Sequence, residues 1–328
     1  MNLLDVRNLC VRYGSEQTGV LAVDTVDLRI GQGEFVGLAG ESGCGKTTLA
    51  MAIPNLLPEG ATVVSGSVTF DGQDITHASE ETLNSIRWKE ISVIFQGALN
   101  ALNPVKSVGW QIAEPMLAHD SGLSDKDALA RARELLDAVG ISKSRSSAYP
   151  HEFSGGMRQR VMIAMALACK PKLVIADEPI TALDVMTQAQ ILDLLRSLSS
   201  SFDLSLLLIS HDLSVLADTC DRVQVMYAGK AVESGSAETI FASADSSESA
   251  AHPYTNRLLK SYPNILHERV FIDGIPGYPP DLSLPQTGCR FAARCDQVQS
   301  VCRTQEPALI ELHTNHFVAC HFAEQVSR

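Results

Sequence analysis

The sequence has few aromatic residues and few positive charges. Phe, Trp and Tyr make up 5% of 328 residues, and 26 Lys and Arg stand against 38 Asp and Glu, which gives a formal net charge of -12. Aliphatic residues raise the hydrophobic content to 45%, which is enough for one large core with a smaller appendage. Because an acidic chain is a poor non-specific ligand for nucleic acid or for an anionic membrane, we expect no nucleic-acid partner.

Long apolar runs are also missing. The longest candidate, residues 161–169, is far shorter than the roughly 20 apolar residues of a membrane span and stops at Lys170. The N-terminus has no basic region followed by an apolar run, so a signal peptide is not expected. The sequence therefore predicts a cytosolic protein that reaches a membrane only by docking onto other subunits.

The eight cysteines include no C-x-x-C pair. Cys10, Cys44, Cys169 and Cys220 are scattered among aliphatic segments, which is typical of small buried hydrophobic residues. The other four lie in the last 40 residues: Cys289, Cys295, Cys302 and Cys320. In a reducing cytosol such a cluster binds metal more often than it forms disulfides.

Hydrophobic periodicity predicts an α/β domain. Alternating residues indicate strands at 3–13 and 20–30, and shorter apolar runs indicate strands at 35–39, 67–70, 91–95, 173–176 and 204–209. Helical patterns cover 46–57, 105–140 and 157–168. Fully apolar short strands between helices favour a parallel sheet that is covered on both faces.

A composition change suggests two domains. Residues 243–251 form a polar low-complexity stretch, and prolines gather beyond it between 276 and 285. We place the boundary so that residues 1–235 form the main domain and residues 236–328 form a C-terminal extension.

The strongest motif is a phosphate loop at residues 40–47, Gly-Glu-Ser-Gly-Cys-Gly-Lys-Thr, which matches G-x-x-x-x-G-K-[ST] between a strand and a helix. Its glycines let backbone N–H groups surround an anion. Lys46 is expected to contact the β- and γ-phosphates, and Thr47 to ligate Mg²⁺. The predicted nucleotide-binding residues here are Gly40, Ser42, Gly43, Cys44, Gly45, Lys46, Thr47 and Thr48.

Two adjacent acids, Asp177 and Glu178, end the apolar strand at 173–176. Asp177 can hold Mg²⁺ through water, and Glu178 can orient the attacking water as general base. Taken alone, such a pair is equally typical of a solvated turn. Beside a phosphate loop the functional interpretation is favoured.

Residues 153–160, which contain Ser154-Gly155-Gly156, resemble the signature motif of ABC ATPases and stand just before the acidic strand, in that family's order. Further matches are Tyr13 at the adenine-stacking position, Gln96 at the Q-loop, residues 182–184 (Ala-Leu-Asp) at the D-loop and His211 at the switch position. The resemblance covers residues 1 to about 235.

The resemblance implies a P-loop NTPase fold: a RecA-like core, an N-terminal antiparallel β subdomain and a helical signature subdomain. It implies that Gln96 contributes to the Mg²⁺ shell, that His211 reaches the γ-phosphate, and that Ser154, Gly155, Gly156 and Asp184 close on the ATP of a second subunit. Two residues depart from the pattern. Met157 replaces the usual Gln, and Ile180 stands where the family has Thr or Ser, so a hydroxyl group beside Glu178 is lost.

Residues 252–259, the proline-rich stretch 275–280 and the four clustered cysteines resemble the C-terminal segment of dipeptide and oligopeptide importers. In that family the cysteines are associated with an iron–sulfur cluster, so the resemblance implies one here, of the 4Fe–4S type. Spacings of five, six and seventeen residues leave zinc and free thiols open, and His316 and His321 are alternative zinc ligands.

These observations predict an ATPase subunit that powers uptake of peptides, at the cytoplasmic face of the inner membrane. The resemblance implies two permease subunits, an extracytoplasmic solute-binding protein and a second ATPase subunit, a paralogue rather than a copy. Nickel or an oligosaccharide are alternative solutes. A soluble ABC regulatory ATPase, a metal or redox sensor, or an unrelated P-loop kinase are weaker alternatives.

Overall fold

The structure, a computed structural model, describes most of the chain: residues 2–16, 18–97, 101–181, 183–242, 251–261 and 274–323. These residues form two compact units. Unit 1 consists of residues 30–34 and 77–209. Unit 2 consists of residues 2–29, 35–76 and 210 onward.

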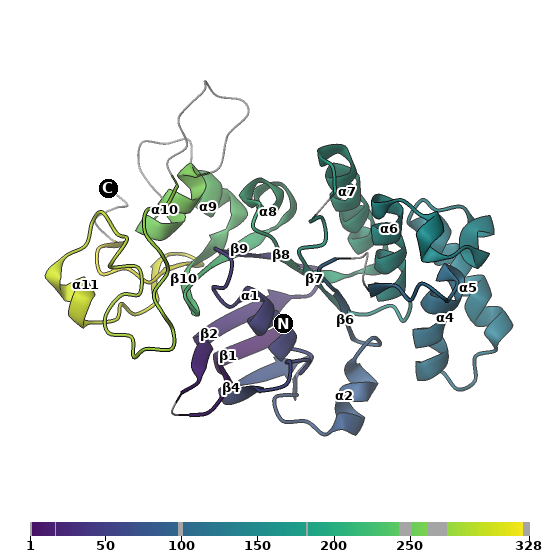
Figure 1. The fold of residues 1–328 in the computed structure, drawn as a ribbon, viewed down its shortest axis with the longest axis horizontal. Helices are drawn as coiled ribbons and strands as arrows, with labels where there is room; N and C mark the ends of the chain where they lie inside the picture. The colour runs from purple at the N-terminus through teal and green to yellow at the C-terminus, as the bar shows by residue number, and fades with distance from the viewer. Residues whose placement is uncertain are drawn as a thin grey trace. The chain divides into compact units, whose positions relative to one another are not determined.

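Unit 2 begins with a four-stranded sheet in the order β2-β1-β4-β5 (Figure 1). Its strands are β1 (Asn2–Tyr13), β2 (Val20–Gly31), β4 (Ala61–Phe70) and β5 (Gln73–Asp74). β1 pairs with β4 in antiparallel fashion, with Leu4 opposite Phe70. Val26, Leu28 and Ile30 of β2 are buried while the residues between them are exposed, which is the alternation of a half-buried strand. The predicted antiparallel β subdomain is confirmed.

Unit 2 also contains a mixed group of strands. β3 (Phe35–Ala39) runs parallel to β9 (Arg222–Tyr227), and antiparallel β10 (Lys230–Ser236), β12 (His316–Val318) and β11 (Ile310–His313) follow. The helices of this unit are α1 (Lys46–Ala52), α8 (Leu213–Thr219), α9 (Ala237–Ala242), α10 (Pro253–Lys260) and α11 (Ser300–Thr304).

Unit 1 is built on three parallel strands, β6 (Ile91–Ile94), β7 (Leu173–Asp177) and β8 (Ser205–Ile209). Every residue of β7 and β8 is buried, as the fully apolar pattern predicts for a parallel sheet. Its helices are α2 (Glu80–Ile86), α4 (Val108–His119), α5 (Asp125–Ala138), α6 (Gly155–Ala166) and α7 (Val185–Phe202), with 3₁₀ turns η1 (Lys143–Ser147) and η2 (Pro150–Glu152). α4, α5 and α6 pack together as a helical group (Figure 1).

Two predicted helices differ from the observed ones. The helix that begins at Lys46 ends at Ala52 rather than Leu57. Pro54 has no N–H to continue it, Asn55 takes a left-handed φ of 53°, and the Leu56 N–H donates to the Met51 carbonyl at 2.8 Å. The stretch 105–140, which has a helical pattern, forms two helices, and the second begins where the Ser124 side chain accepts the Asp127 N–H.

The C-terminal extension joins the mixed strands of unit 2. β12 pairs with β10, with Glu233 opposite Val318, although 85 positions separate these residues in the printed sequence. Most of the low-complexity stretch, residues 243–250, lies outside the described residues. The domain boundary between residues 235 and 236 stays a prediction.

None of the helices in the described ranges is both long enough and apolar enough to cross a bilayer.

Candidate nucleotide-binding site

The phosphate loop joins β3 to α1 in unit 2, and two of its glycines are sterically required. Gly40 has a φ of 144°, and a Cβ atom there would lie 2.2 Å from the Met226 carbonyl oxygen. Gly45 has a φ of 105°, and a Cβ atom there would lie 2.3 Å from the Ala22 carbonyl oxygen. Any other residue would force the backbone to move, so the loop conformation depends on these two positions.

Lys46 is buried inside the loop. Its ammonium group donates to the carbonyl oxygens of Gly40 at 2.7 Å and of Glu41 at 3.0 Å, and it lies 3.6 Å from the Cys44 thiol. Burial also raises the pKa of Cys44, so this thiol is neutral and acts as a packing group. The acceptors of the Lys46 ammonium group are therefore neutral carbonyl oxygens, which a charged phosphate group can replace because it is a stronger acceptor.

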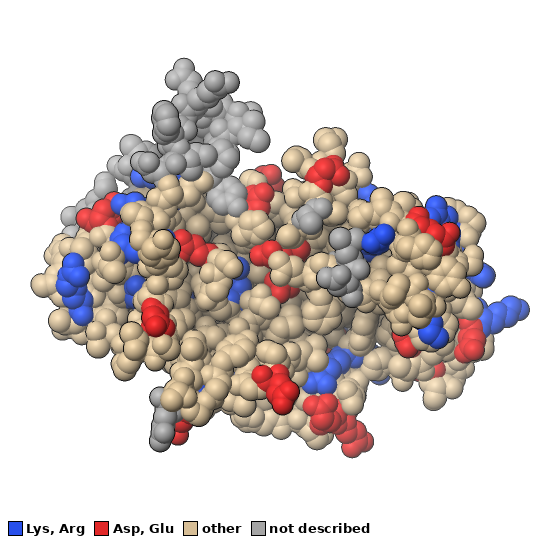
Figure 2. Space-filling model, in the orientation of Figure 1, with Lys and Arg blue, Asp and Glu red and all other residues tan. Residues whose placement is uncertain are grey.

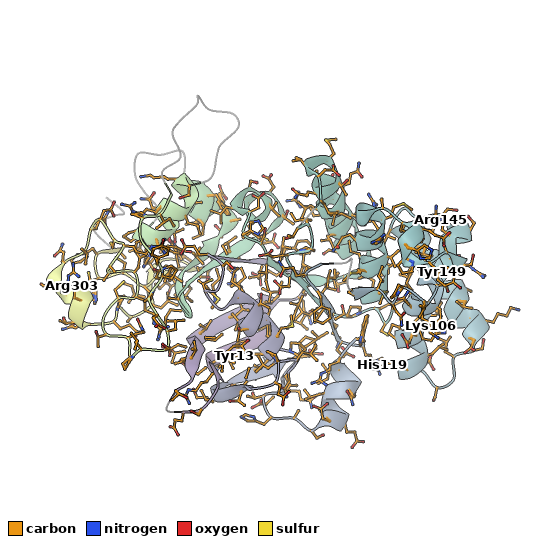
Figure 3. All side chains as sticks on the ribbon, in the orientation of Figure 1. Tyr13, Lys106, His119, Arg145, Tyr149 and Arg303 are labelled. Carbon is orange, nitrogen blue, oxygen red and sulfur yellow. The ribbon has the colours of Figure 1, made fainter. Side chains whose placement is uncertain are left out.

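Tyr13, the last residue of β1, lies beside the first turn of α1 (Figure 3). Its hydroxyl group is 3.1 Å from the Thr48 hydroxyl group. Thr47, the predicted Mg²⁺ ligand, is exposed. The structure therefore brings Tyr13, the predicted stacking residue, next to the phosphate loop, although it precedes the first loop residue, Gly40, by 27 positions.

In unit 1 the acidic pair ends β7. Asp177 is buried, and Glu178 follows it with a left-handed φ of 46°. One carboxylate oxygen of Glu178 accepts hydrogen bonds from the Gln96 amide at 2.9 Å and from the Thr181 hydroxyl at 3.0 Å. Both contacts hold the carboxylate at the end of the strand.

Thr181 is a functional candidate that the sequence interpretation missed. The only available signal was a hydroxyl residue three positions after Glu178, which by itself is common. Ile180, the departure from the family pattern, is buried, and its carbonyl oxygen accepts from the Gln188 amide at 3.3 Å. The Thr181 hydroxyl thus bonds the Glu178 carboxylate from this turn.

The signature residues start α6. Ser154 caps the helix by accepting the Met157 N–H at 3.3 Å, and Ser154 and Gly155 are exposed. A Cβ atom on Gly156 would lie 2.5 Å from the Thr187 methyl group, so the loop approaches α7 closely.

Asp184 caps α7. It accepts the Thr187 N–H at 3.0 Å and the Thr187 hydroxyl at 2.7 Å, and these hydrogen bonds lower the pKa of Asp184. Ala182 of the predicted D-loop lies outside the described residues.

The predicted site residues fall into two groups. Unit 2 carries Tyr13, the phosphate loop and His211, which is exposed just before the α8 cap residue Asp212. Unit 1 carries Gln96, the signature residues, Asp177, Glu178 and Asp184. That both groups serve one ATP site stays a prediction.

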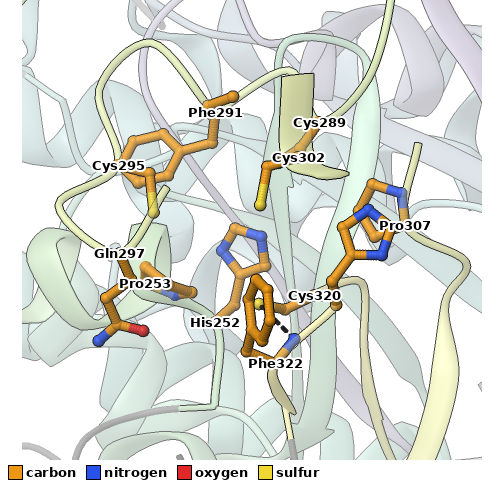
Figure 4. Close-up of a pocket in the computed structure, with 12 residues that line it drawn as sticks. His252, Pro253, Cys289, Phe291, Cys295, Gln297, Cys302, Pro307, Cys320 and Phe322 are labelled. Atoms are coloured by element: carbon orange, nitrogen blue, oxygen red, sulfur yellow. Dashed lines mark hydrogen bonds between the residues drawn. The ribbon is translucent and has the colours of Figure 1, made fainter. Parts of the chain in front are cut away.

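The four clustered cysteines line one small cavity together with His252 and His321 (Figure 4). Burial, with a smaller contribution from the neighbouring thiols, raises the pKa of Cys289 to about 11. Across the described part of the chain, no three or more His, Cys, Asp or Glu side chains are arranged as a ready metal site. Of the alternative zinc ligands, His316 is bonded to buried Glu233 at 2.8 Å instead.

Of the scattered cysteines, Cys10, Cys44 and Cys220 are buried as predicted. Cys169 is only half-buried, and it lines a groove with residues of α4 and α5. Its thiol has a pKa raised to about 11 by burial, so it is not a reactive thiolate.

Comparison with known proteins identifies the family. Residues 23–181 match the ABC transporter family model, and residues 232–302 match the oligopeptide/dipeptide transporter C-terminal region. The chain is 44% identical to a probable peptide ABC transporter ATP-binding protein of Sinorhizobium fredii, over 99% of this chain and 96% of that one. It is 41% identical to the dipeptide transport ATP-binding protein DppD of Escherichia coli, over 98% and 97%.

Solved structures agree with the fold. The ATP-binding cassette MJ0796, in a dimeric state bound to ADP and phosphate, aligns with a TM-score of 0.64 and 28% identity, over 71% of this chain and 98% of that one. The protein cbiO1 of Clostridium perfringens, described as part of the ABC transporter complex cbiONQ, aligns with a TM-score of 0.64 and 27% identity, over 74% of this chain and 91% of that one. The P-loop ABC ATPase fold is thereby confirmed. The chain belongs to the ABC transporter ATP-binding proteins of the oligopeptide/dipeptide type, and it is an ATPase.

Proposed function

We propose that this chain hydrolyses ATP to drive an importer of dipeptides or oligopeptides across the cytoplasmic membrane. The observation that carries the proposal is the Gln96–Glu178–Thr181 arrangement on a chain that also has a sterically required phosphate loop. The peptide substrate is supported by the C-terminal region match and by relatives named for peptide transport. Nickel and oligosaccharide remain the alternative solutes.

Each residue has a role in this chemistry. Lys46 leaves its two carbonyl partners for the phosphates, and Thr47, Gln96 and Asp177 are the Mg²⁺-side ligands. A Mg²⁺ ion bound by these residues would neutralise charge on the phosphate oxygens. Glu178 orients water and accepts its proton, while Gln96 and Thr181 hold the carboxylate in place.

A second ATPase subunit is required to complete the site. Ser154 and Gly155 are exposed, so they are free to face a nucleotide held by another chain. Val185 and Met186, in the first turn of α7, are 79% and 72% exposed, which is unusual for neighbouring large apolar residues and fits a subunit contact. We infer that the partner is a paralogous ATPase, since the family often pairs different subunits.

The loop after Gln96 is the proposed contact with the two permease subunits. Gln111 accepts the Asn103 N–H at 2.8 Å and donates to the carbonyls of Asn103 and Lys106 at 3.0 and 2.9 Å. Lys106 lies over the Trp110 ring at 4.2 Å. This bracing presents Val105, which is 75% exposed, as a rigid apolar contact. Such docking places the chain at the cytoplasmic face of the inner membrane, in a complex that includes a solute-binding protein outside.

We propose further that Cys289, Cys295, Cys302 and Cys320 hold an iron–sulfur cluster, with zinc as the alternative. The support is that all four line one cavity, although they do not stand as a finished ligand set. Because burial raises the pKa values of the Cys289, Cys295 and Cys320 thiols, metal binding must release protons, and metal affinity will rise with pH. Metal analysis of anaerobically purified protein tests this. Bound iron with inorganic sulfide would support the cluster, and bound zinc would support the alternative. Protein that contains neither metal would exclude both.

A soluble regulatory role has less support. On the face drawn in Figure 2, Lys and Arg side chains are dispersed among Asp and Glu, with no broad basic surface in view for nucleic acid. The test of the importer is purification of the chain from its native membrane with the bound subunits, followed by uptake assays in proteoliposomes. ATP-dependent uptake of labelled peptides, lost in Lys46→Ala, supports the proposal. Uptake of nickel or oligosaccharides alone, or no membrane partner, contradicts it.

A further inference from the structure

Glu41, the second residue of the phosphate loop, is held by the C-terminal extension. All of the contacts lie within unit 2. The Glu41 carboxylate pairs with Arg294, the Glu41 N–H donates to the Tyr254 hydroxyl, and the Glu41 carbonyl accepts from Lys46. One loop residue therefore connects the lysine that binds phosphate to two side chains that are more than 200 residues away in sequence.

Arg294 is fully committed to this contact. Its guanidinium donates to both carboxylate oxygens of Glu41, at 2.7 and 2.9 Å, in a two-pronged ion pair. The remaining donors reach the carbonyls of Pro276 and Ile275, at 2.9 and 3.2 Å, and the Tyr227 hydroxyl at 3.2 Å. The arginine side chain is 4% exposed, and the glutamate side chain is 26% exposed. All five guanidinium N–H groups are thus used, so the arginine cannot easily turn elsewhere.

Tyr254 supplies the second restraint. Its side chain is fully buried, and its hydroxyl accepts the Glu41 N–H at 2.9 Å. Its ring packs against Tyr227 and Phe291, with centroids 4.6 and 5.4 Å apart. Tyr227 ends β9, the parallel neighbour of β3, from which the phosphate loop begins. The aromatic cluster therefore fixes the extension at the base of the loop.

We propose that Arg294 and Tyr254 are positioning residues for ATP binding: through Glu41 they hold the entrance of the phosphate loop in its binding conformation. The proposal rests on the proposed function, because it concerns the same loop. A loop that is already ordered loses less conformational freedom when the nucleotide binds, so binding is tighter. The hydrogen bonds from both residues to the phosphate loop go to Glu41, so both act through the loop.

The first test is ATP affinity of the full-length chain, measured by calorimetry. Arg294→Met removes the ion pair, Arg294→Lys keeps the charge without the two-pronged geometry, and Tyr254→Phe keeps the ring without the acceptor. We expect Arg294→Met to raise the Kd for ATP by roughly tenfold, with a smaller rise for the other two variants. The matched control is Arg303→Met, an exposed arginine on α11 of the same extension (Figure 3).

A merely structural role predicts different results. In the transporter complex, a positioning role raises the KM for ATP while kcat changes little. A double-mutant cycle with Glu41→Gln must show that the two changes are not additive, since Arg294 acts through Glu41. Glu41→Gln changes the more exposed partner of the ion pair and leaves the C-terminal extension unaltered. It therefore tests the positioning role even where Arg294→Met fails to fold.

The outcomes are distinguishable from failure of the proposed function. Loss of ATP binding in Lys46→Ala with unchanged binding in Arg294→Met and Glu41→Gln overturns the positioning role alone. A lower unfolding temperature with unchanged Kd also overturns it. Additive effects in the cycle would show that Arg294 acts by another route. Wild-type protein that does not bind ATP overturns both proposals.

Discussion

His252 makes the C-terminal extension sensitive to acid. The residue is buried at the start of α10, and its Nδ1 accepts the Tyr254 N–H at 3.1 Å. An accepting Nδ1 must be unprotonated. Burial lowers the pKa of His252 from its ordinary 6.5 to about 4, against the opposing effects of Glu233 and the Ala319 carbonyl. Protonation of His252 in the folded protein is thus suppressed until the pH is well below neutral.

The sign and size of the effect follow from proton linkage. The pKa is lower in the folded state, so between pH 6.5 and about 4 the unfolded chain binds more protons and folding stability falls with the pH. The stabilisation is complete above pH 6.5. For pKa values of 6.5 and about 4, stability falls by about 2 kcal/mol between pH 7.5 and pH 5.

The assay is urea unfolding followed by circular dichroism at these two pH values. The matched variant is His252→Asn, because an Asn side chain can still cap α10 but does not titrate. The variant is expected to be less stable at pH 7.5, since it is smaller, but its stability should fall about 2 kcal/mol less than that of the wild type on going to pH 5. Equal losses in the two proteins would refute the reasoning, because other groups would then account for the acid sensitivity.

Three further predictions concern the ATPase itself. Gly156→Ala places a Cβ atom 2.5 Å from the Thr187 methyl group, so hydrolysis by the assembled transporter should fall at least tenfold while the isolated chain keeps its ATP affinity; unchanged hydrolysis would contradict the close packing. Thr181→Val removes a hydrogen bond to Glu178 at 3.0 Å and should lower kcat about three- to tenfold with little change in KM, and an equal kcat would remove Thr181 from the site. Val105→Asp should release the chain from its membrane partners in pull-down experiments without altering ATP binding, and retained partners would disprove the docking loop.

The parts of the site that are local in sequence could be predicted. Gly40 and Gly45 have positive φ and no room for a Cβ atom, and the spacing of the phosphate loop already demands glycine there. The strands β7 and β8 were also recognisable, because burial on both faces leaves a single polar residue in each, Asp177 in β7 and Ser205 in β8. The end of α1 could also have been predicted, because Pro54 and Asn55 are residues that commonly end a helix, but the prediction extended the helix to Leu57.

Contacts between distant segments could not be predicted from the residues alone. The pairing of Arg294 with Glu41 spans 253 positions, and neither residue is unusual in its local sequence. The pairing of β12 with β10 likewise depends on strands of only three and seven residues, which carry little periodicity. The Gln96–Glu178 contact, 82 positions apart, was not predicted, because the family resemblance implied only that Gln96 contributes to the Mg²⁺ shell.

The measurement that tests the central claim most directly is steady-state ATP hydrolysis by the assembled transporter carrying Glu178→Gln. The change keeps the shape of the side chain and its hydrogen bond from Thr181 but removes the base. If Glu178 activates water, kcat should fall by about 100-fold or more while ATP stays bound. Full turnover by the variant would contradict the account, because the chain would then hydrolyse ATP without the carboxylate that Gln96 and Thr181 hold in place.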